Sequence, residues 1–204
     1  MNKICIVALL IAFSNLANSQ FSLELNAGNK RVAAYIKGFR YMDKSKQWSI
    51  YSANRVAVNY KTGRPGFSSM NMLAYHFRNG IGIVAALMAG NNKLHPIAGL
   101  QYQKTIKSFY FYFLSTYELN KFTRQENYLT LVYKHKLSKE VKFIFHYENY
   151  ICFLKWGYDQ SLQRIRSGLE IKKTQVGFVS ETSQTGKTHT TSLVNAGCFI
   201  KQTF

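Results

Sequence analysis

The sequence predicts an all-β protein: a closed, antiparallel, up-and-down transmembrane β-barrel of about twelve strands, with ten as the alternative count. Three observations predict it. Apolar residues recur at every second position along most of the chain, turn residues interrupt these runs every 10 to 15 residues, and the runs are mostly 9 to 14 residues long. A tilted strand needs roughly 9 to 11 residues to cross a bilayer, whereas strands of soluble sheets usually have about 5 or 6. An even strand number is typical of single-chain bacterial barrels.

Short polar and glycine-containing segments mark the predicted reversals of the chain. Examples are Asn79-Gly80 and the segments 43–46 and 159–161. Residues of this kind join neighbouring strands through tight turns. The chain contains only two prolines, no linker and no run with helical periodicity. It is therefore predicted to be one antiparallel meander, in which residues 21–28 form either the first strand or a lead-in segment.

Residues 1–19 have the layout of a cleavable secretory signal. Lys3 precedes the apolar run 4–13, and Ala17-Asn18-Ser19 supplies a small-x-small ending. The apolar run is too short to cross a bilayer as a helix, and no later run reaches the roughly 18 apolar residues that a spanning helix needs. We therefore expect export, cleavage near Ser19, and a barrel formed by residues 20–204.

The alternation gives each predicted strand one apolar face and one polar face. In the segments 141–148 and 164–172, apolar residues alternate with lysine, arginine, histidine and glutamate. If the apolar face meets lipid, the polar face lines the lumen. The side chains predicted to face the lumen are Arg55, Lys134, Lys142, His146, Glu148, Arg164, Arg166 and Lys172. The segment 108–114 is aromatic on both faces, so its orientation stays open.

The charge balance indicates anionic partners. The chain has 27 lysines and arginines against 9 aspartates and glutamates, a formal net charge of +18. Such an excess favours nucleic acid, phosphate-bearing lipids or an anionic solute. An exported protein seldom meets nucleic acid, so we expect none as a partner, and the lipid and solute options remain. A basic lumen favours anions, but long side chains in a narrow barrel can also plug it.

The C-terminal segment VNAGCFIKQTF carries a resemblance to a known class. Val194, Ala196, Cys198, Ile200 and Phe204 share one face of a predicted last strand. This ending resembles that of bacterial outer-membrane β-barrel proteins, in which a terminal aromatic residue acts as the recognition signal for the barrel-assembly machinery. Gln202 departs from that pattern, which usually has an apolar residue there.

The resemblance covers nearly the whole chain and implies a location. With the signal segment and the ladder of strands, the chain is similar to small barrels of the Bacteroidota outer membrane. This implies an integral protein of the outer membrane of a Gram-negative bacterium, in contact with outer-membrane lipids and the barrel-assembly machinery. It implies no activity, and the oligomeric state stays open.

No segment carries a recognisable catalytic, cofactor or metal motif. Gly186-Lys187-Thr188 suggests a phosphate loop, but Glu181 stands where that motif needs a glycine. Lipid hydrolases built on barrels use a serine and a histidine two residues apart on one strand, and none of the five histidines has such a serine. A pair formed across strands stays open. Cys152, Cys198 and the histidines show no spacing typical of metal ligands, and spacing does not reveal whether the two cysteines pair.

These observations favour a non-enzymatic, porin-like protein of the cell envelope, without cofactor, metal or catalytic residues. It is expected to be either a narrow, anion-favouring pore or a structural or accessory barrel. The alternatives are a membrane-embedded lipid-modifying enzyme and a soluble exported β-protein that binds a ligand in its interior.

Overall fold

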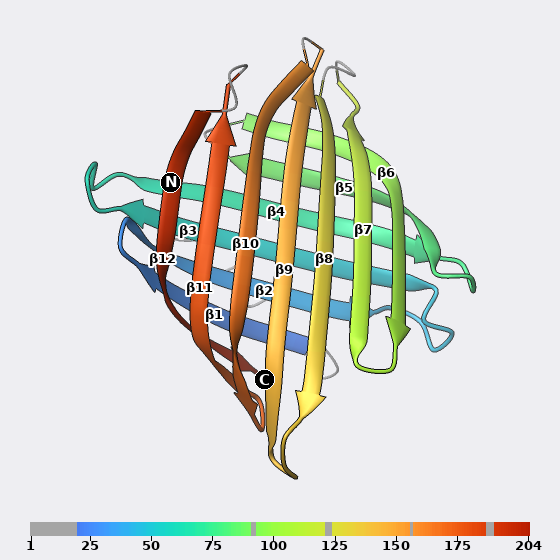
Figure 1. Cartoon of the computed structure of the whole chain (residues 1–204). Coiled ribbons are helices and arrows are strands. Elements are labelled where there is room, and N and C mark those ends of the chain that lie inside the picture. Colours follow the sequence, from blue (N-terminus) through green and yellow to red (C-terminus); the bar gives the residue numbers. More distant parts are fainter. Residues whose placement is uncertain (1–19, 91–92, 121–123, 156, 187–189) are drawn as a thin grey trace, which may run out of the picture.

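A computed structural model of the chain describes residues 20–90, 93–120, 124–155, 157–186 and 190–204 (Figure 1). The expected signal segment, residues 1–19, lies outside the described residues. Within the described ranges the chain forms twelve strands: β1 (Gln20–Gly28), β2 (Arg31–Tyr41), β3 (Trp48–Asn59), β4 (Pro65–His76), β5 (Ile81–Gly90), β6 (Lys93–Ile106), β7 (Phe109–Glu118), β8 (Arg124–Lys136), β9 (Val141–Leu154), β10 (Gly157–Ile171), β11 (Thr174–Thr185) and β12 (Thr190–Thr203). In this part of the chain, no helix is long and apolar enough to cross a membrane.

The strands close into a barrel in simple sequence order. Each strand pairs antiparallel with the next, and β1 pairs with β12 to complete the ring. The backbone N–H of Phe204 donates to the carbonyl of Phe21, so the start of β1 and the C-terminal residue lie at one end of the barrel, here called the terminus end. The opposite end is called the far end. The predicted closed antiparallel barrel of twelve strands is confirmed, and residues 21–28 belong to a strand.

One predicted reversal is wrong. Residues 159–161 lie inside β10, where the register against β9 shifts between Tyr158 and Gln160. A register shift of this kind marks a β-bulge or a similar irregularity of the strand, which accommodates turn-forming residues without reversing the chain. The strand instead begins at Gly157, whose φ of 109° few residues other than glycine adopt.

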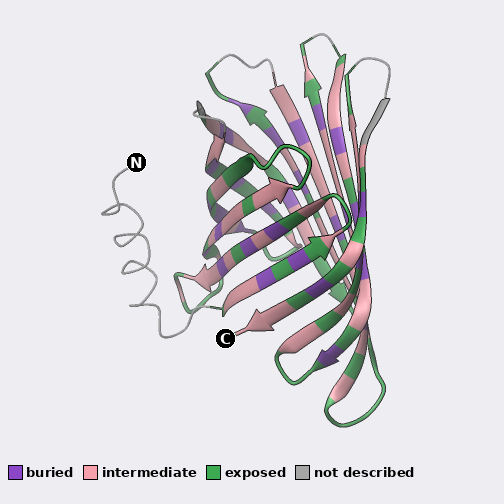
Figure 2. Ribbon diagram, turned by 90° about the vertical axis from the view of Figure 1, so that its left-hand side faces the viewer, coloured by how far each residue is buried: buried purple, intermediate pink, exposed green. Residues whose placement is uncertain are grey.

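The outward face of the barrel is apolar. Buried and exposed residues alternate along the strands (Figure 2), and the exposed positions include Phe145, Ile165, Leu169 and Ile171, with exposures of 38, 44, 38 and 43%. Phe178 is 72% exposed. A belt of large apolar side chains around a closed barrel fits contact with hydrocarbon rather than water, because contact with water is unfavourable for apolar surface.

The aromatic segment 108–114 follows the same rule. Phe109 and Phe113 are 60% and 38% exposed on the outer face, whereas Leu114 is 5% exposed and packs inside. Tyr110 and Tyr112 line the interior cavity. The tyrosines, which carry a hydroxyl group, thus face the polar interior, and the phenylalanines face outward.

A small polar island interrupts the outer belt on β3 and β4. Ser52 donates to the Asn71 side-chain oxygen at 2.9 Å, and the Asn54 amide donates to the Ser52 hydroxyl at 3.2 Å. The Asn71 amide in turn donates to the Ser69 hydroxyl at 3.4 Å. These mutual hydrogen bonds reduce the cost of placing polar groups among apolar neighbours.

Paired glycines allow two neighbouring strands of the barrel to approach closely. In Figure 1, β8 to β11 stand upright in front, and β1 to β4 cross behind them at a large angle. Gly168 and Gly177 are register partners on β10 and β11. A Cβ added to Gly168 would lie 2.1 Å from the Val176 carbonyl oxygen, and one added to Gly177 would lie 2.1 Å from the Ser167 carbonyl oxygen. The two strands approach closely only because neither residue has a side chain.

Candidate functional site

The barrel encloses a cavity of about 940 Å³. Its lining runs from Gln20 and Lys173 at the terminus end to Ser68 on β4 and Glu126 on β8, toward the far end. Residues of all twelve strands contribute to the lining. This cavity is the candidate functional site.

A buried cluster of charges forms one wall of the interior. Glu181 on β11 is fully buried and accepts from Arg31 Nη2 at 2.8 Å and from Arg164 Nε at 2.6 Å. Tyr35 on β2 donates its hydroxyl to the same carboxylate at 3.1 Å and accepts from Arg164 Nη2. The charges of Glu181, Arg31 and Arg164 are therefore paired, which reduces the cost of burying them in a low dielectric.

Glu148 on β9 is the second carboxylate of this wall that contacts several partners. Its carboxylate accepts from Arg164 Nη1 at 2.9 Å, and Arg166 Nη2 lies 3.2 Å from it. Tyr128 donates its hydroxyl at 2.8 Å, and Lys37 Nζ lies at 3.4 Å. Glu148 thus joins residues of β2, β8 and β10 across the interior.

The remaining members of the wall centre on Arg166. Its guanidinium contacts Glu24 on β1 and lies 2.6 Å from His146 Nδ1. His146 Nε2 is also 3.5 Å from Glu148. The expected lumen residues His146, Glu148, Arg164 and Arg166 therefore come together in one network.

The other expected lumen residues are placed at different depths. Lys134 and Lys142 both contact Glu170, at 2.7 and 3.1 Å, near the terminus end. Lys172 lies beyond the end of β10, in the turn to β11, with a positive φ of 56°. It is exposed and contributes to the rim of the cavity.

Besides the exposed Lys172 and Lys173 at the rim, two cations of the lining have no acidic partner in the described part of the chain. Arg55 on β3 donates its Nε to the Tyr35 hydroxyl at 3.1 Å, while its Nη2 is buried without an acceptor among the described residues. Lys201 on β12 lines the cavity, and no described carboxylate lies within ion-pair distance of it. Arg55 was expected from the sequence. Lys201, like Lys37 and Glu181, was not selected, although all three alternate with outward-facing neighbours.

The opposite wall of the interior is apolar. Met72, Ala74, Val84, Ala86, Ile97 and Leu114 form a buried cluster on β4 to β7. Partly buried Tyr51, Met70, Met88, Tyr112 and Tyr128 pack against it and line the cavity. Sequence alternation alone missed this wall, because methionine and alanine at inward positions do not stand out from an outward apolar face.

The charged lining is predominantly basic. Among the described residues that line the cavity, seven are lysine or arginine and three are glutamate, an excess of four positive charges. The basic residues are Lys37, Arg55, Lys134, Arg164, Lys172, Lys173 and Lys201, and the acidic ones are Glu126, Glu148 and Glu170.

The structure also forms the cross-strand serine–histidine pair that the sequence left open. Ser49 Oγ on β3 lies 2.7 Å from His76 Nε2 on β4. The side-chain amides of Gln101 and Gln103 lie 3.0 and 3.1 Å from His76 Nδ1. Ser49 is only 1% exposed, and no described carboxylate contacts the imidazole. The geometry suits a buried hydrogen-bonded cluster better than an accessible nucleophile.

The residues of the expected assembly signal share the outer face of β12. Val194, Ile200 and Phe204 are 51, 48 and 61% exposed, and Ala196 and Cys198 are also exposed. Cys198 and the buried Cys152 are both free thiols. Among the described residues, no group of three or more histidines, cysteines, aspartates or glutamates is placed to hold a metal ion.

Of the comparisons with known proteins, only the one with solved structures bears on the architecture. No protein-family model matches the sequence, and no curated protein matches it. Among solved structures, a KdgM porin in complex with disordered oligogalacturonate aligns with a TM-score of 0.52 at 10% identity, over 91% of this chain and 99% of that one. This chain therefore has the fold of outer-membrane porins.

Two further solved structures match less closely. OprD from Pseudomonas aeruginosa aligns with a TM-score of 0.42 at 8% identity, over 82% of this chain and 58% of that one. OmpT of Vibrio cholerae, with a deletion of its loop L8, aligns with a TM-score of 0.40 at 10% identity, over 91% and 97%.

Proposed function

We propose that this protein is a non-enzymatic pore of the outer membrane that admits small anionic solutes. The observation that carries the proposal is the lining of the cavity, in which seven basic side chains among the described residues face three acidic ones. A narrow passage with an excess of fixed positive charge attracts anions and repels cations, because the surrounding protein and lipid screen charge poorly.

The pairing of the charges strengthens this argument. Glu148 and Glu181 each accept several hydrogen bonds from buried cations and tyrosines, so their charge is largely offset. Arg55 and Lys201 line the cavity without a described acidic partner, so their positive charge is not offset. The KdgM porin, which shares the fold, was solved in complex with oligogalacturonate, a chain of sugar acids, which supports an anionic solute here.

The export, assembly and membrane location of the pore are inferred from the sequence and from the apolar outer belt. We infer that residues 1–19 direct export, that the barrel-assembly machinery recognises the outer face of β12, and that the belt contacts outer-membrane lipids. A Bacteroidota-like origin belongs to the same proposal and rests on the resemblance of the sequence.

Conductance in planar bilayers tests the function. The purified barrel, verified by heat-modifiable migration on a gel, should produce channel events, and its reversal potential in a potassium chloride gradient should have the sign of chloride selectivity. Complete absence of channel events would contradict the pore. The buried charge network would then favour a structural or accessory barrel.

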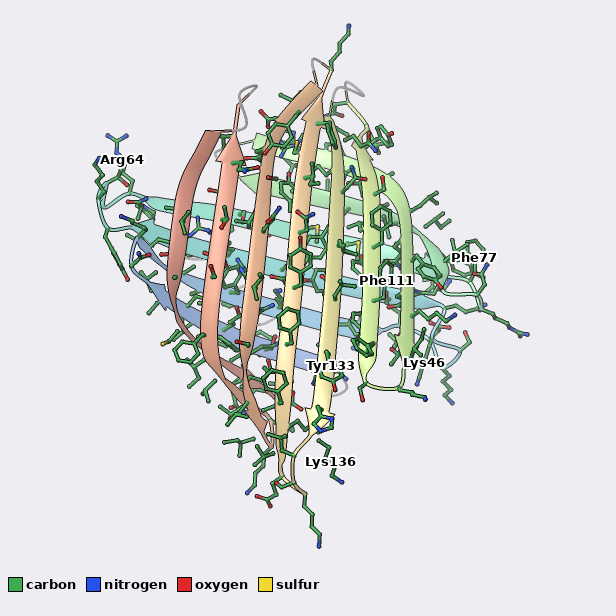
Figure 3. All side chains as sticks on the ribbon, viewed as in Figure 1. Lys46, Arg64, Phe77, Phe111, Tyr133 and Lys136 are labelled. Carbon is green, nitrogen blue, oxygen red and sulfur yellow. The ribbon has the colours of Figure 1, made fainter. Side chains whose placement is uncertain are left out.

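A matched pair of triple variants assigns the selectivity to the lumen. Replacing Lys37, Arg55 and Lys201 with glutamine should shift the reversal potential toward zero, because it removes three of the seven basic lining charges. Replacing Lys46, Arg64 and Lys136 removes the same charge from the exposed ends of the barrel (Figure 3) and should have a much smaller effect. Equal effects of both variants would assign the selectivity to the net charge of the protein instead.

A further inference from the structure

Two cations and two methionines lie side by side on the inner face of four consecutive strands. Lys37, Ala53, Met70 and Met88 are register partners in a row across β2, β3, β4 and β5. Arg55 stands two residues from Ala53 on the same face of β3, and all five residues line the cavity. Since neighbouring strands are about 4.8 Å apart, the row extends about 14 Å from Lys37 to Met88.

The two cations keep hydrogen-bonding capacity that the described residues do not use. Arg55 Nη2 has no acceptor among the described residues. Lys37 Nζ lies 3.4 Å from Glu148, longer than the 2.7–2.9 Å typical of a strong charge-assisted hydrogen bond. An anionic group placed between them would find donors on both sides.

The methionines give the adjoining surface an apolar character that a water-filled pore does not need. Met70 and Met88 are partly buried and rest on the buried cluster that includes Met72 and Ile97. Ala53 separates them from Lys37 and, being short, leaves a shallow floor. Interiors of membrane barrels are normally polar, and methionine adapts to apolar ligands of varied shape.

We propose that this group of residues is a binding subsite for organic anions with an apolar body. Arg55 and Lys37 hold the acidic head, and Ala53, Met70 and Met88 contact the hydrocarbon or aromatic body. The subsite distinguishes such solutes from chloride or acetate, which meet only its charged half. This inference rests on the proposed anion pore and names the class of solute that the pore prefers.

The length of the ligand's hydrocarbon chain tests the subsite directly. Binding of labelled acetate, butyrate and hexanoate is measured on the full barrel in lipid nanodiscs, with binding to empty nanodiscs subtracted. A fully buried methylene strengthens binding about fourfold, so partial burial of hexanoate should make it bind about tenfold or more tightly than acetate. Equal affinities for the three carboxylates would overturn the proposal.

Variants separate the charged half from the apolar half. Arg55→Gln should weaken all three carboxylates by a similar factor of about ten, because it removes a charged hydrogen-bond donor. The double variant Met70→Ser, Met88→Ser should reduce hexanoate binding to the level of acetate and leave acetate unchanged. The controls Arg64→Gln and Met42→Ser make the same changes at exposed residues of the loop after β3 and the turn after β2 and should alter neither.

The outcomes also separate this proposal from the pore itself. If the barrel shows no chloride selectivity in bilayers but still binds hexanoate more tightly than acetate in nanodiscs, the pore is contradicted and the subsite is supported. Chloride selectivity in bilayers together with equal binding of acetate, butyrate and hexanoate would support the pore and contradict the subsite. If Arg55→Gln fails to fold, Lys37→Gln tests the same head group, and unchanged hexanoate binding in the methionine double variant still refutes the apolar half.

Discussion

At the scale of single residues, Glu181 organises much of the charged wall. It is fully buried and receives hydrogen bonds from Arg31 and Tyr35 on β2 and from Arg164 on β10. Arg164 also contacts Glu148, so the loss of one carboxylate affects the whole network. Removing one partner of a buried ion pair leaves an uncompensated charge, which is far more costly than removing an exposed one.

The variant Glu181→Leu should therefore destabilise the barrel strongly. We expect a loss of about 3 to 5 kcal/mol in the free energy of unfolding, measured by denaturant titration from lipid vesicles. Glu140→Leu, at an exposed position in the turn after β8, is the control and should change stability by no more than about 0.5 kcal/mol. A small effect at Glu181 would mean that the two arginines find other acceptors.

Ser49 and His76 allow a test that separates structure from catalysis. Ser49→Ala removes the hydroxyl that contacts His76 Nε2 and should lower the free energy of unfolding by about 1 kcal/mol. Ser180→Ala, on the exposed face of β11, should have little effect. The acylation pattern of membrane lipids, followed by mass spectrometry, should be the same with either variant. A changed lipid pattern in Ser49→Ala alone would support an enzyme.

At the scale of the strands, the close approach of β10 and β11 depends on two glycines. Gly177→Ala would place a Cβ 2.1 Å from the Ser167 carbonyl oxygen, so the strands would have to separate and lose hydrogen bonds. We expect this variant to refold poorly, with a reduced heat-modifiable fraction on gels. In Gly66→Ala the nearest atom lies 3.9 Å from the new Cβ, so refolding should be normal. Equal refolding of both variants would contradict the close approach of β10 and β11.

The turn between β2 and β3 gives a pH-dependent contribution to stability. The Ser45 hydroxyl and the backbone amides of Trp48 and Gln47 hydrogen-bond to the Asp43 carboxylate and lower its pKa below the ordinary 3.8. A lowered pKa means that the ionised form is favoured in the folded state. The contribution is therefore present above the unfolded pKa and is lost as the pH falls through the folded pKa.

Unfolding measurements across pH check this assignment. Wild-type barrel should exceed Asp43→Asn in stability at neutral pH, and the difference should shrink as the pH falls below 3.8. Ser45→Ala should reduce the neutral-pH advantage, since it removes the largest cause of the shift. A difference between wild type and Asp43→Asn that is independent of pH would contradict the role of the ionised carboxylate.

The sequence predicted features of the site that lie within one strand, but not the contacts that form between strands. Alternation along 141–148 and 164–172 indicated which face of each strand is polar, because side chains point alternately to the two faces. The contact between Arg164 and Glu181 depends on the register of β10 and β11, and that between Tyr35 and Glu181 on closure of the ring. No local pattern encodes either. Ser49 and His76 are likewise 27 residues apart and meet only through the pairing of β3 and β4.

At the scale of the whole molecule, the barrel separates two environments by a single layer of backbone. The outer belt exposes large apolar side chains such as Phe178, while the interior carries the charged wall, the apolar wall and the cavity between them. The proposed pore needs both, since lipid must surround the belt and water must fill the cavity. A measurement that distinguishes lipid contact from water contact therefore tests the molecule as a whole.

The two described cysteines provide this measurement without any substitution. Cys198 is exposed on the outer face of β12, next to outward-facing Phe178 of β11, and Cys152 on β9 is completely buried. A lipid-confined maleimide should therefore label Cys198 in reconstituted vesicles, and a membrane-impermeant, water-soluble maleimide should label it poorly. Cys152 should react with neither reagent until the barrel is unfolded. Peptide mass analysis assigns the label, and Cys198→Ser is the control. Rapid labelling of Cys198 from water, with no labelling from lipid, would show that water contacts the apolar belt and would contradict the membrane barrel.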